Sequence, residues 1–108
     1  MAYIDKKIAM QYLANSEKIF DKLKTNFLNT YKNFKPQMES YIKNNDFDSI
    51  HNLIHQIKGI SLNIGSEVLY DDSIKILDEI RKKGEVAPFL LECYIETFEM
   101  WYLELSKL

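Results

Sequence analysis

The sequence is poor in residues that interrupt helices, with three glycines and two prolines among 108 residues. Glycine and proline destabilise helix interiors, so their scarcity predicts long helices joined by short connections. Cysteine is also nearly absent, since Cys93 is the only one. A single cysteine excludes an internal disulfide and a multi-cysteine metal site. The apolar neighbours of Cys93 predict a buried side chain that fills space rather than acting as a nucleophile.

Long apolar runs and a strong excess of one charge are missing too. No apolar run approaches the ~18 residues of a membrane-spanning helix, and residues 1–5 do not resemble a signal peptide. We therefore expect a cytoplasmic protein with no membrane partner. The net charge of −2 argues against a nucleic-acid partner, which would call for a basic face. The length predicts a single domain, residues 1–108.

What the sequence does contain is apolar residues at spacings of three and four, the pattern of amphipathic helices. A short opening helix is expected over residues 4–13, with Asp5 near its start and Asn15 past its end. Ser16 is a good N-cap for a second helix, whose apolar stripe Pro36 interrupts. We expect either one long helix kinked at Pro36 or two helices nearly in line. The stripe consists of Ile19, Phe20, Leu23, Phe27, Tyr31, Phe34, Met38, Tyr41 and Ile42.

Local signals set the bounds of the remaining helices. Asp46 caps a helix that ends near Gly65, whose missing Cβ permits a closing positive φ. Ser66 caps the next helix, Gly84 ends it, and Pro88 begins the last one. The pattern predicts an all-α fold: an antiparallel up-and-down four-helix bundle with a short extra N-terminal helix. We expect a monomer, because no second apolar stripe is evident. The broad apolar face of the last helix comprises Leu90, Leu91, Tyr94, Ile95, Phe98, Trp101, Tyr102 and Leu105.

The central helix directs its apolar side chains to one face and His55 to the other. At ~100° per residue the apolar face is centred between Leu53 and Ile57, and His55 projects about 160° from that centre. Lys58 and Gly59 follow His55 at i+3 and i+4. A neutral imidazole is a competent nucleophile near pH 7, an ammonium stabilises phosphoryl oxygens, and glycine leaves room for them. The arrangement predicts a histidine that accepts a phosphoryl group reversibly. The core residues of this helix are Ile50, Leu53, Ile54, Ile57, Ile60 and Ile64.

Other interpretations of these residues stay open. A lone exposed histidine is most often only solvated, and Gly59 would also permit close helix packing. His51 and His55 lie at i and i+4, a spacing that lets two imidazoles share one metal ion. Asp48 lies roughly on the same face. Two histidines and one aspartate make a thin site, so we expect no metal.

The residues around His55 resemble the signature of histidine-containing phosphotransfer (HPt) domains. The matching motif is His55-x-x-Lys58-Gly59-x-Ser61-x-Asn63-x-Gly65-x-x-x-Leu69. The resemblance extends to several shorter segments, and so covers nearly all of the chain. These segments are residues 4–5, 9–13, 20–23 and 27–28, the polar turn at residues 45–46, and residues 77–79. Asn15 departs from it, because many members have a glycine there, but that position lies in a connecting turn.

The resemblance implies a phosphorelay carrier. His55 would accept a phosphoryl group through Nε2 from the aspartyl phosphate of one receiver domain and pass it to the aspartate of another. Lys58 would stabilise the phosphoryl charge and Gly59 would keep the site open. The partners would be receiver domains of response regulators or hybrid histidine kinases. These would supply Mg²⁺, and no cofactor of the chain's own is expected.

Further residues are weaker candidates for the same site. Gln56 would donate at its rim, Ser61 lies nearer the core face, and Leu62 would be an outward docking contact. Arg81 would add positive potential from the adjacent helix. No ATP-dependent autokinase activity is expected, because a glycine-rich nucleotide loop is missing. The alternatives are a receiver-binding module that takes no phosphate, or a histidine-bearing domain that a kinase catalytic domain phosphorylates directly.

Overall fold

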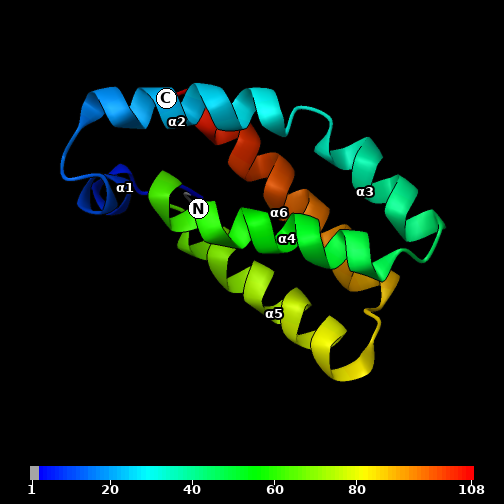
Figure 1. Ribbon diagram of the computed structural model, residues 1–108. Coiled ribbons are helices and arrows are strands. Elements are labelled where there is room, and N and C mark those ends of the chain that lie inside the picture. Colours follow the sequence, from blue (N-terminus) through cyan, green and yellow to red (C-terminus); the bar gives the residue numbers. More distant parts are fainter. Residues whose placement is uncertain (1–2) are drawn as a thin grey trace.

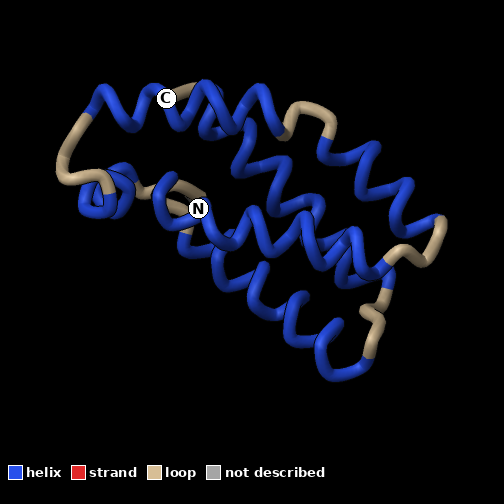
Figure 2. Tube along the Cα trace, viewed as in Figure 1, coloured by secondary structure: helices blue, strands red, loops and turns tan. Residues whose placement is uncertain are grey.

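The computed structural model describes residues 3–108, and all regular structure in that range is helical (Figures 1 and 2). Helices make up 80% of the chain, which confirms the predicted all-α class. None of the helices within residues 3–108 is long and apolar enough to cross a membrane. The elements are α1 (Lys6–Tyr12), α2 (Glu17–Thr30), α3 (Phe34–Lys43), α4 (Phe47–Ser61), the 3₁₀ turn η1 (Leu62–Ile64), α5 (Glu67–Lys83) and α6 (Pro88–Ser106).

Side-chain caps begin the helices where the sequence predicts them. Ser16, Asp46 and Ser66 each accept a hydrogen bond from the amide three residues later, at 3.2, 3.2 and 3.1 Å. Each bond satisfies one of the amides that a helix start leaves without an intrahelical partner. Asp5 caps α1 in a similar way, by accepting from the amide two residues later. These predicted starts are confirmed.

The interruption near Pro36 is a break between two helices, and it precedes the proline. α2 ends at Thr30, and α3 begins at Phe34. Pro36 is the third residue of α3, within the first turn, where its missing amide hydrogen costs no intrahelical bond. The expectation of two helices is confirmed, whereas the expected kink at Pro36 and the expected near-alignment of the two helices are wrong. Figure 1 shows α3 inclined to α2 rather than continuing its line.

Buried apolar side chains from α1 to α6 and from η1 form one hydrophobic core. α4 packs along α5 and against α3, and α6 packs against α2, α3 and α5. At its centre the rings of Phe34 and Phe98 stack 3.8 Å apart, next to the fully buried Trp101. The predicted inward face of α4 is confirmed, with Ile60 half-buried and the others buried. Those buried residues are Ile50, Leu53, Ile54, Ile57 and Ile64.

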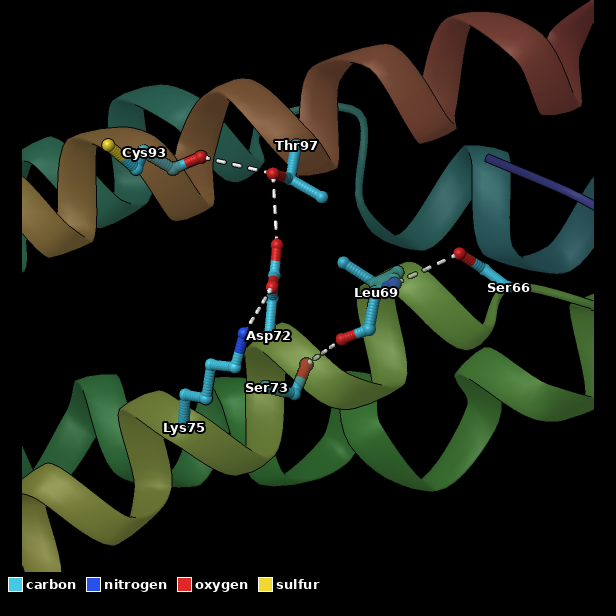
Figure 3. Close-up of polar contacts among 7 residues, drawn as sticks. All are labelled: Ser66, Leu69, Asp72, Ser73, Lys75, Cys93 and Thr97. Atoms are coloured by element: carbon cyan, nitrogen blue, oxygen red, sulfur yellow. Dashed lines mark hydrogen bonds and ion pairs between the residues drawn. The ribbon is translucent and has the colours of Figure 1, made fainter. Parts of the chain in front are cut away.

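The prediction that Cys93 is buried is wrong. The thiol is exposed and lines a cleft of about 530 Å³ between α5 and α6. At ~100° per residue Cys93 lies roughly 130° from the centre of the buried face of α6. Polar contacts bridge the two helices here, as Figure 3 shows: Thr97 donates to the Cys93 carbonyl and to Asp72, whose carboxylate also pairs with Lys75.

Two residues of the predicted apolar stripes also lie outside the core. Ile19 on α2 and Leu90 on α6 are exposed, at 46% and 39%. Both stand at the edge of their stripe near a helix start. There, fewer neighbouring elements are available to cover a side chain than at mid-helix.

The N-terminal segment ties two distant parts of the chain together. The Tyr3 amide donates to the carboxylate of Glu104 near the end of α6, at 2.7 Å. The Asp5 amide donates to the carbonyl of Gly65 after η1, also at 2.7 Å. Gly65 has φ +80°, and an added Cβ would lie 2.1 Å from the Asp5 carbonyl oxygen. Gly65 therefore closes η1 and also admits the close approach of Asp5, whereas the α-helix that was expected to end near Gly65 already ends at Ser61.

Candidate functional site

α4 holds His55 on the face opposite the core. Ile54 and Ile57 are fully buried, whereas the His55 side chain is exposed. The predicted outward orientation of His55 is thus confirmed. The burial of Ile54 and Ile57 fixes the rotation of α4 about its axis. The His55 imidazole therefore faces solvent from a helix that is packed on the core.

His55 lines a small cleft between α4 and α5. The cleft has a volume of about 200 Å³, and α5 folds back beside α4 to form its second wall (Figure 1). His51, His55 and Lys58 come from α4, and Ile74, Leu77, Asp78 and Arg81 come from α5. Ile74 and Leu77 form the apolar part of the lining, and the other five side chains are polar. The structure thus brings His55, Lys58 and Arg81 of the predicted set into one site.

The two imidazoles stand one turn apart with nearly parallel rings. The ring centroids of His51 and His55 are 6.2 Å apart, at an interplanar angle of 17°. His51 is half-buried and His55 is exposed. Ile54 and His55 follow His51 at i+3 and i+4, so His51 lacks the lysine and glycine that follow His55 at these spacings. Of the two imidazoles, His55 is the more accessible to solvent.

The charges of the cleft are unevenly engaged. Arg81 on α5 forms an ion pair with Asp78, one turn earlier on the same helix. Their side chains are 72% and 40% exposed. Within residues 3–108, Lys58 has no ion-pair partner. The site therefore offers one free ammonium and one guanidinium held by a carboxylate.

Gly59 leaves open space beside the site. An added Cβ there would meet no atom within 4 Å, and Gly59 has no positive φ. Neither close packing nor backbone conformation requires a glycine at this position, so the packing interpretation of Gly59 is not needed. A bare patch of helix next to His55 is what remains.

The weaker candidates lie in different surroundings. Gln56 is exposed beside His55. Ser61 is fully buried, and its hydroxyl donates to the Lys58 carbonyl at 2.9 Å, so it acts on the helix end and not on a ligand. Leu62 belongs to η1 and is half-buried.

A metal-ion site would require several donor side chains close together. Within residues 3–108, no group of three or more His, Cys, Asp or Glu side chains is arranged to hold a metal ion. His51 and His55 supply two imidazoles. Because their rings are nearly parallel, the ring nitrogens do not point toward one shared metal position. Asp48 is exposed near the start of α4.

The α5 wall contains residues that sequence reasoning did not assign to the site. Ile74, Leu77 and Asp78 line it together with Arg81. These four stand at i, i+3, i+4 and i+7, which is one face of a helix. That spacing could have shown that these residues share a helix face with Arg81, but not that this face borders α4.

Comparisons with protein families, with curated proteins and with solved structures find no match to this chain. A function must therefore follow from the site itself. Its elements are an exposed imidazole, a free ammonium, a guanidinium and an open stretch of helix.

Proposed function

We propose that the chain is a phosphorelay carrier of the HPt type, with His55 as the residue that carries the phosphoryl group. The observation that carries the proposal is that the exposed imidazole of His55 shares one cleft with Lys58 and Arg81. Gly59, with open space around it, leaves room for a partner's backbone at the same place. The resemblance of the motif from His55 to Leu69 supports the same proposal.

The proposed transfer needs only groups of the chain and of the receiver. The neutral imidazole of His55 attacks the phosphorus of an aspartyl phosphate, through Nε2 as the resemblance implies. A nitrogen–phosphorus bond forms, the acyl phosphate's phosphorus–oxygen bond breaks, and the receiver's carboxylate leaves with the electron pair. The same steps in reverse load a second receiver. Lys58 and Arg81 offset the charge on the phosphoryl oxygens, and Mg²⁺ belongs to the receiver.

The finer arrangement of the fold forms part of this proposal. We propose that α2 with α3, α4, α5 and α6 make an antiparallel four-helix bundle, with α1 as an additional helix. The packing of α4 along α5, and of α6 against α2, α3 and α5, supports this arrangement. In such a bundle the cleft lies on an outer face, where a receiver can dock on α4 and α5. A monomeric, cytoplasmic protein suits that role.

Transfer from a phosphorylated receiver domain tests the proposal. Receivers from response regulators and hybrid kinases, loaded with labelled phosphate, should pass acid-labile, base-stable label to the protein. His55→Gln should abolish this transfer, and the matched control His51→Gln should retain it. Persistent labelling of His55→Gln would refute the assignment of the carrier. Binding of receivers without transfer would indicate a receiver-binding module, and labelling by a kinase catalytic domain alone would indicate direct phosphorylation.

Lys58→Ala tests the electrostatic part of the proposal. The variant should fold normally, because Lys58 has no ion-pair partner within residues 3–108. Transfer should slow by roughly tenfold, the effect of one charge-assisted hydrogen bond to the phosphoryl group. Transfer time courses measure it, with Lys82→Ala on α5 as a control outside the cleft. Equal rates for Lys58→Ala and the parent protein would show that Lys58 takes no part.

A further inference from the structure

Arg81 reaches the cleft while bound to another residue that lines it. Its guanidinium is paired with the carboxylate of Asp78, three residues earlier on the same face of α5. Both residues line the cleft with His55 and Lys58. Arg81 is also the only arginine of the chain.

The pair is of a kind that a stronger anion displaces. Exposed ion pairs between neighbouring turns of a helix contribute little to stability, and the Arg81 and Asp78 side chains are 72% and 40% exposed. Asp78 is hydrated easily when its partner leaves. A phosphoryl group carries nearly two negative charges and three acceptor oxygens. The planar fork of a guanidinium binds such a group through two hydrogen bonds.

We propose that Arg81 exchanges partners, binding Asp78 when His55 is empty and the phosphoryl group when His55 is loaded. This inference rests on the proposed function and adds a load-dependent switch to it. In the empty state Asp78 neutralises Arg81 and leaves Lys58 as the free cation. In the loaded state the phosphoryl group is held by both cations and Asp78 is a free carboxylate at the rim. Empty and loaded protein thus present different charges to a receiver at one place.

The exchange can be followed without any receiver. In His51→Gln protein, His55 is the sole imidazole, and potassium phosphoramidate serves as the phosphoryl donor. As the single arginine, Arg81 gives one side-chain Nε–H NMR signal, and this signal should shift when His55 is phosphorylated. In Asp78→Asn the signal of the empty protein should already differ from the parent. After loading, it should reach the parent's loaded position. An unmoved Arg81 signal on protein with phosphorylated His55 would overturn the exchange.

A double-variant experiment separates partner exchange from general electrostatics. Asp78→Asn should speed labelling by phosphoramidate roughly two- to fivefold, because it releases a cation from a weak pair. That gain should vanish in Asp78→Asn/Arg81→Gln compared with Arg81→Gln. The matched control is Glu79→Gln, which breaks the next pair, Glu79–Lys83, outside the cleft and should change nothing. A gain that survives without Arg81, or that Glu79→Gln reproduces, would overturn the proposal.

These outcomes are distinct from a failure of the proposed function. If receivers transfer nothing to His55 but the Arg81 signal moves on chemical phosphorylation, the relay assignment fails while the exchange stands. If transfer occurs and the signal stays in place, only the exchange fails.

Discussion

Two glycines of the chain have open space where a Cβ would stand, and only one of them needs to be glycine for the fold. Gly59 lies within α4, and Gly84 ends α5 with φ +72°. Gly59→Ala should raise the free energy of unfolding by up to ~1 kcal/mol, because alanine favours the helix. Gly84→Ala should lower it by about 1–2 kcal/mol, because the left-handed conformation strains a side chain. Urea unfolding followed by Trp101 fluorescence measures both.

Substitutions of Gly59 can distinguish an effect on stability from an effect on function. Gly59→Gln should keep or increase the stability of the protein while slowing transfer from a receiver, because its side chain occupies the open patch beside His55. Gly59→Ala should slow transfer less. If Gly59→Gln unfolds the protein instead, the glycine is needed for packing, contrary to the open space around it.

Gly65 should tolerate no side chain at all. A Cβ there would collide with the backbone of Asp5, and φ is positive as well. Gly65→Ala should therefore lower the free energy of unfolding by about 2–4 kcal/mol, mostly by detaching residues 3–5. Hydrogen exchange at the Asp5 amide, which donates to Gly65, should become fast. Slow exchange at that amide in Gly65→Ala would contradict the close approach.

Single residues show which structural features a sequence reveals. The capping roles of Ser16, Asp46 and Ser66 follow from the sequence, because cap and partner amide are three residues apart. The second role of Gly65 does not, because Asp5 is remote in the chain and nothing local shows that the two segments meet.

At the scale of elements, the start of α4 depends on the ionisation of its cap. Hydrogen bonds from the Ser49 side chain and amide lower the pKa of Asp46 below its ordinary value of 3.8. A lowered folded pKa stabilises the fold above the unfolded pKa, and this contribution is lost as the pH falls through the folded pKa.

Asp46→Asn isolates that charge, since asparagine is an equally good cap. The variant should be less stable than the parent at neutral pH, and the difference should shrink as the pH falls below 3.8, the ordinary pKa of an aspartate. Urea midpoints at a series of pH values measure it. A difference that is unchanged in acid would show that the Asp46 charge makes no contribution.

Two of the helices whose buried faces were inferred from periodicity, α4 and α6, differ in how well the inference held, for a physical reason. In α4 the apolar residues occupy one side and polar residues the other, so the inward face is unambiguous. In α6 apolar residues occur around most of the helix, with Phe89, Met100 and Leu103 exposed and Trp101 and Leu105 buried. Periodicity then fixes the centre of the buried face but not its edge, and the exposure of Cys93 and Leu90 was missed.

At the scale of the whole molecule, a buried hydrogen bond joins α5 to α6. The Tyr94 and Ser73 hydroxyls are 2.7 Å apart, and Ser73 also donates to the Leu69 carbonyl at 2.7 Å. Burial raises the pKa of Tyr94 well above its ordinary value, although the bond to Ser73 acts the other way. A raised folded pKa stabilises the fold below the unfolded value of 10.0, and that stability is lost as the pH rises above it.

Alkaline unfolding should therefore depend on Tyr94. Tyr94→Phe should cost about 1 kcal/mol near neutral pH through the lost hydrogen bond, and its stability should fall less than the parent's above about pH 10. Ser73→Ala should cost more, about 1–3 kcal/mol, because it leaves a buried hydroxyl without a partner. If the stability of the parent and that of Tyr94→Phe decreased equally as the pH rose in the alkaline range, Tyr94 would not titrate on unfolding.

One half of the candidate site could be predicted from local sequence spacing, whereas the other half depends on long-range packing. Its α4 half, His55 with Lys58 and Gly59, follows from spacings within one helix. Its α5 half depends on the register of two packed helices, which the spacing of either helix alone does not define. Asp78 was therefore not assigned to the site, although it shares a helix face with Arg81.

The contact between Tyr3 and Glu104 has a consequence for the connectivity of the chain. Because the Tyr3 amide is hydrogen-bonded to Glu104 in the last turn of α6, the two extremes of the described residues lie close together, as in many domains that tolerate circular permutation. A short linker from Leu108 to the first residue, with new ends between the exposed Gly84 and Glu85, would reorder the helices without moving them. In that permutant α6 would precede α1 in the sequence, and the face of the molecule that carries His55 would be unchanged.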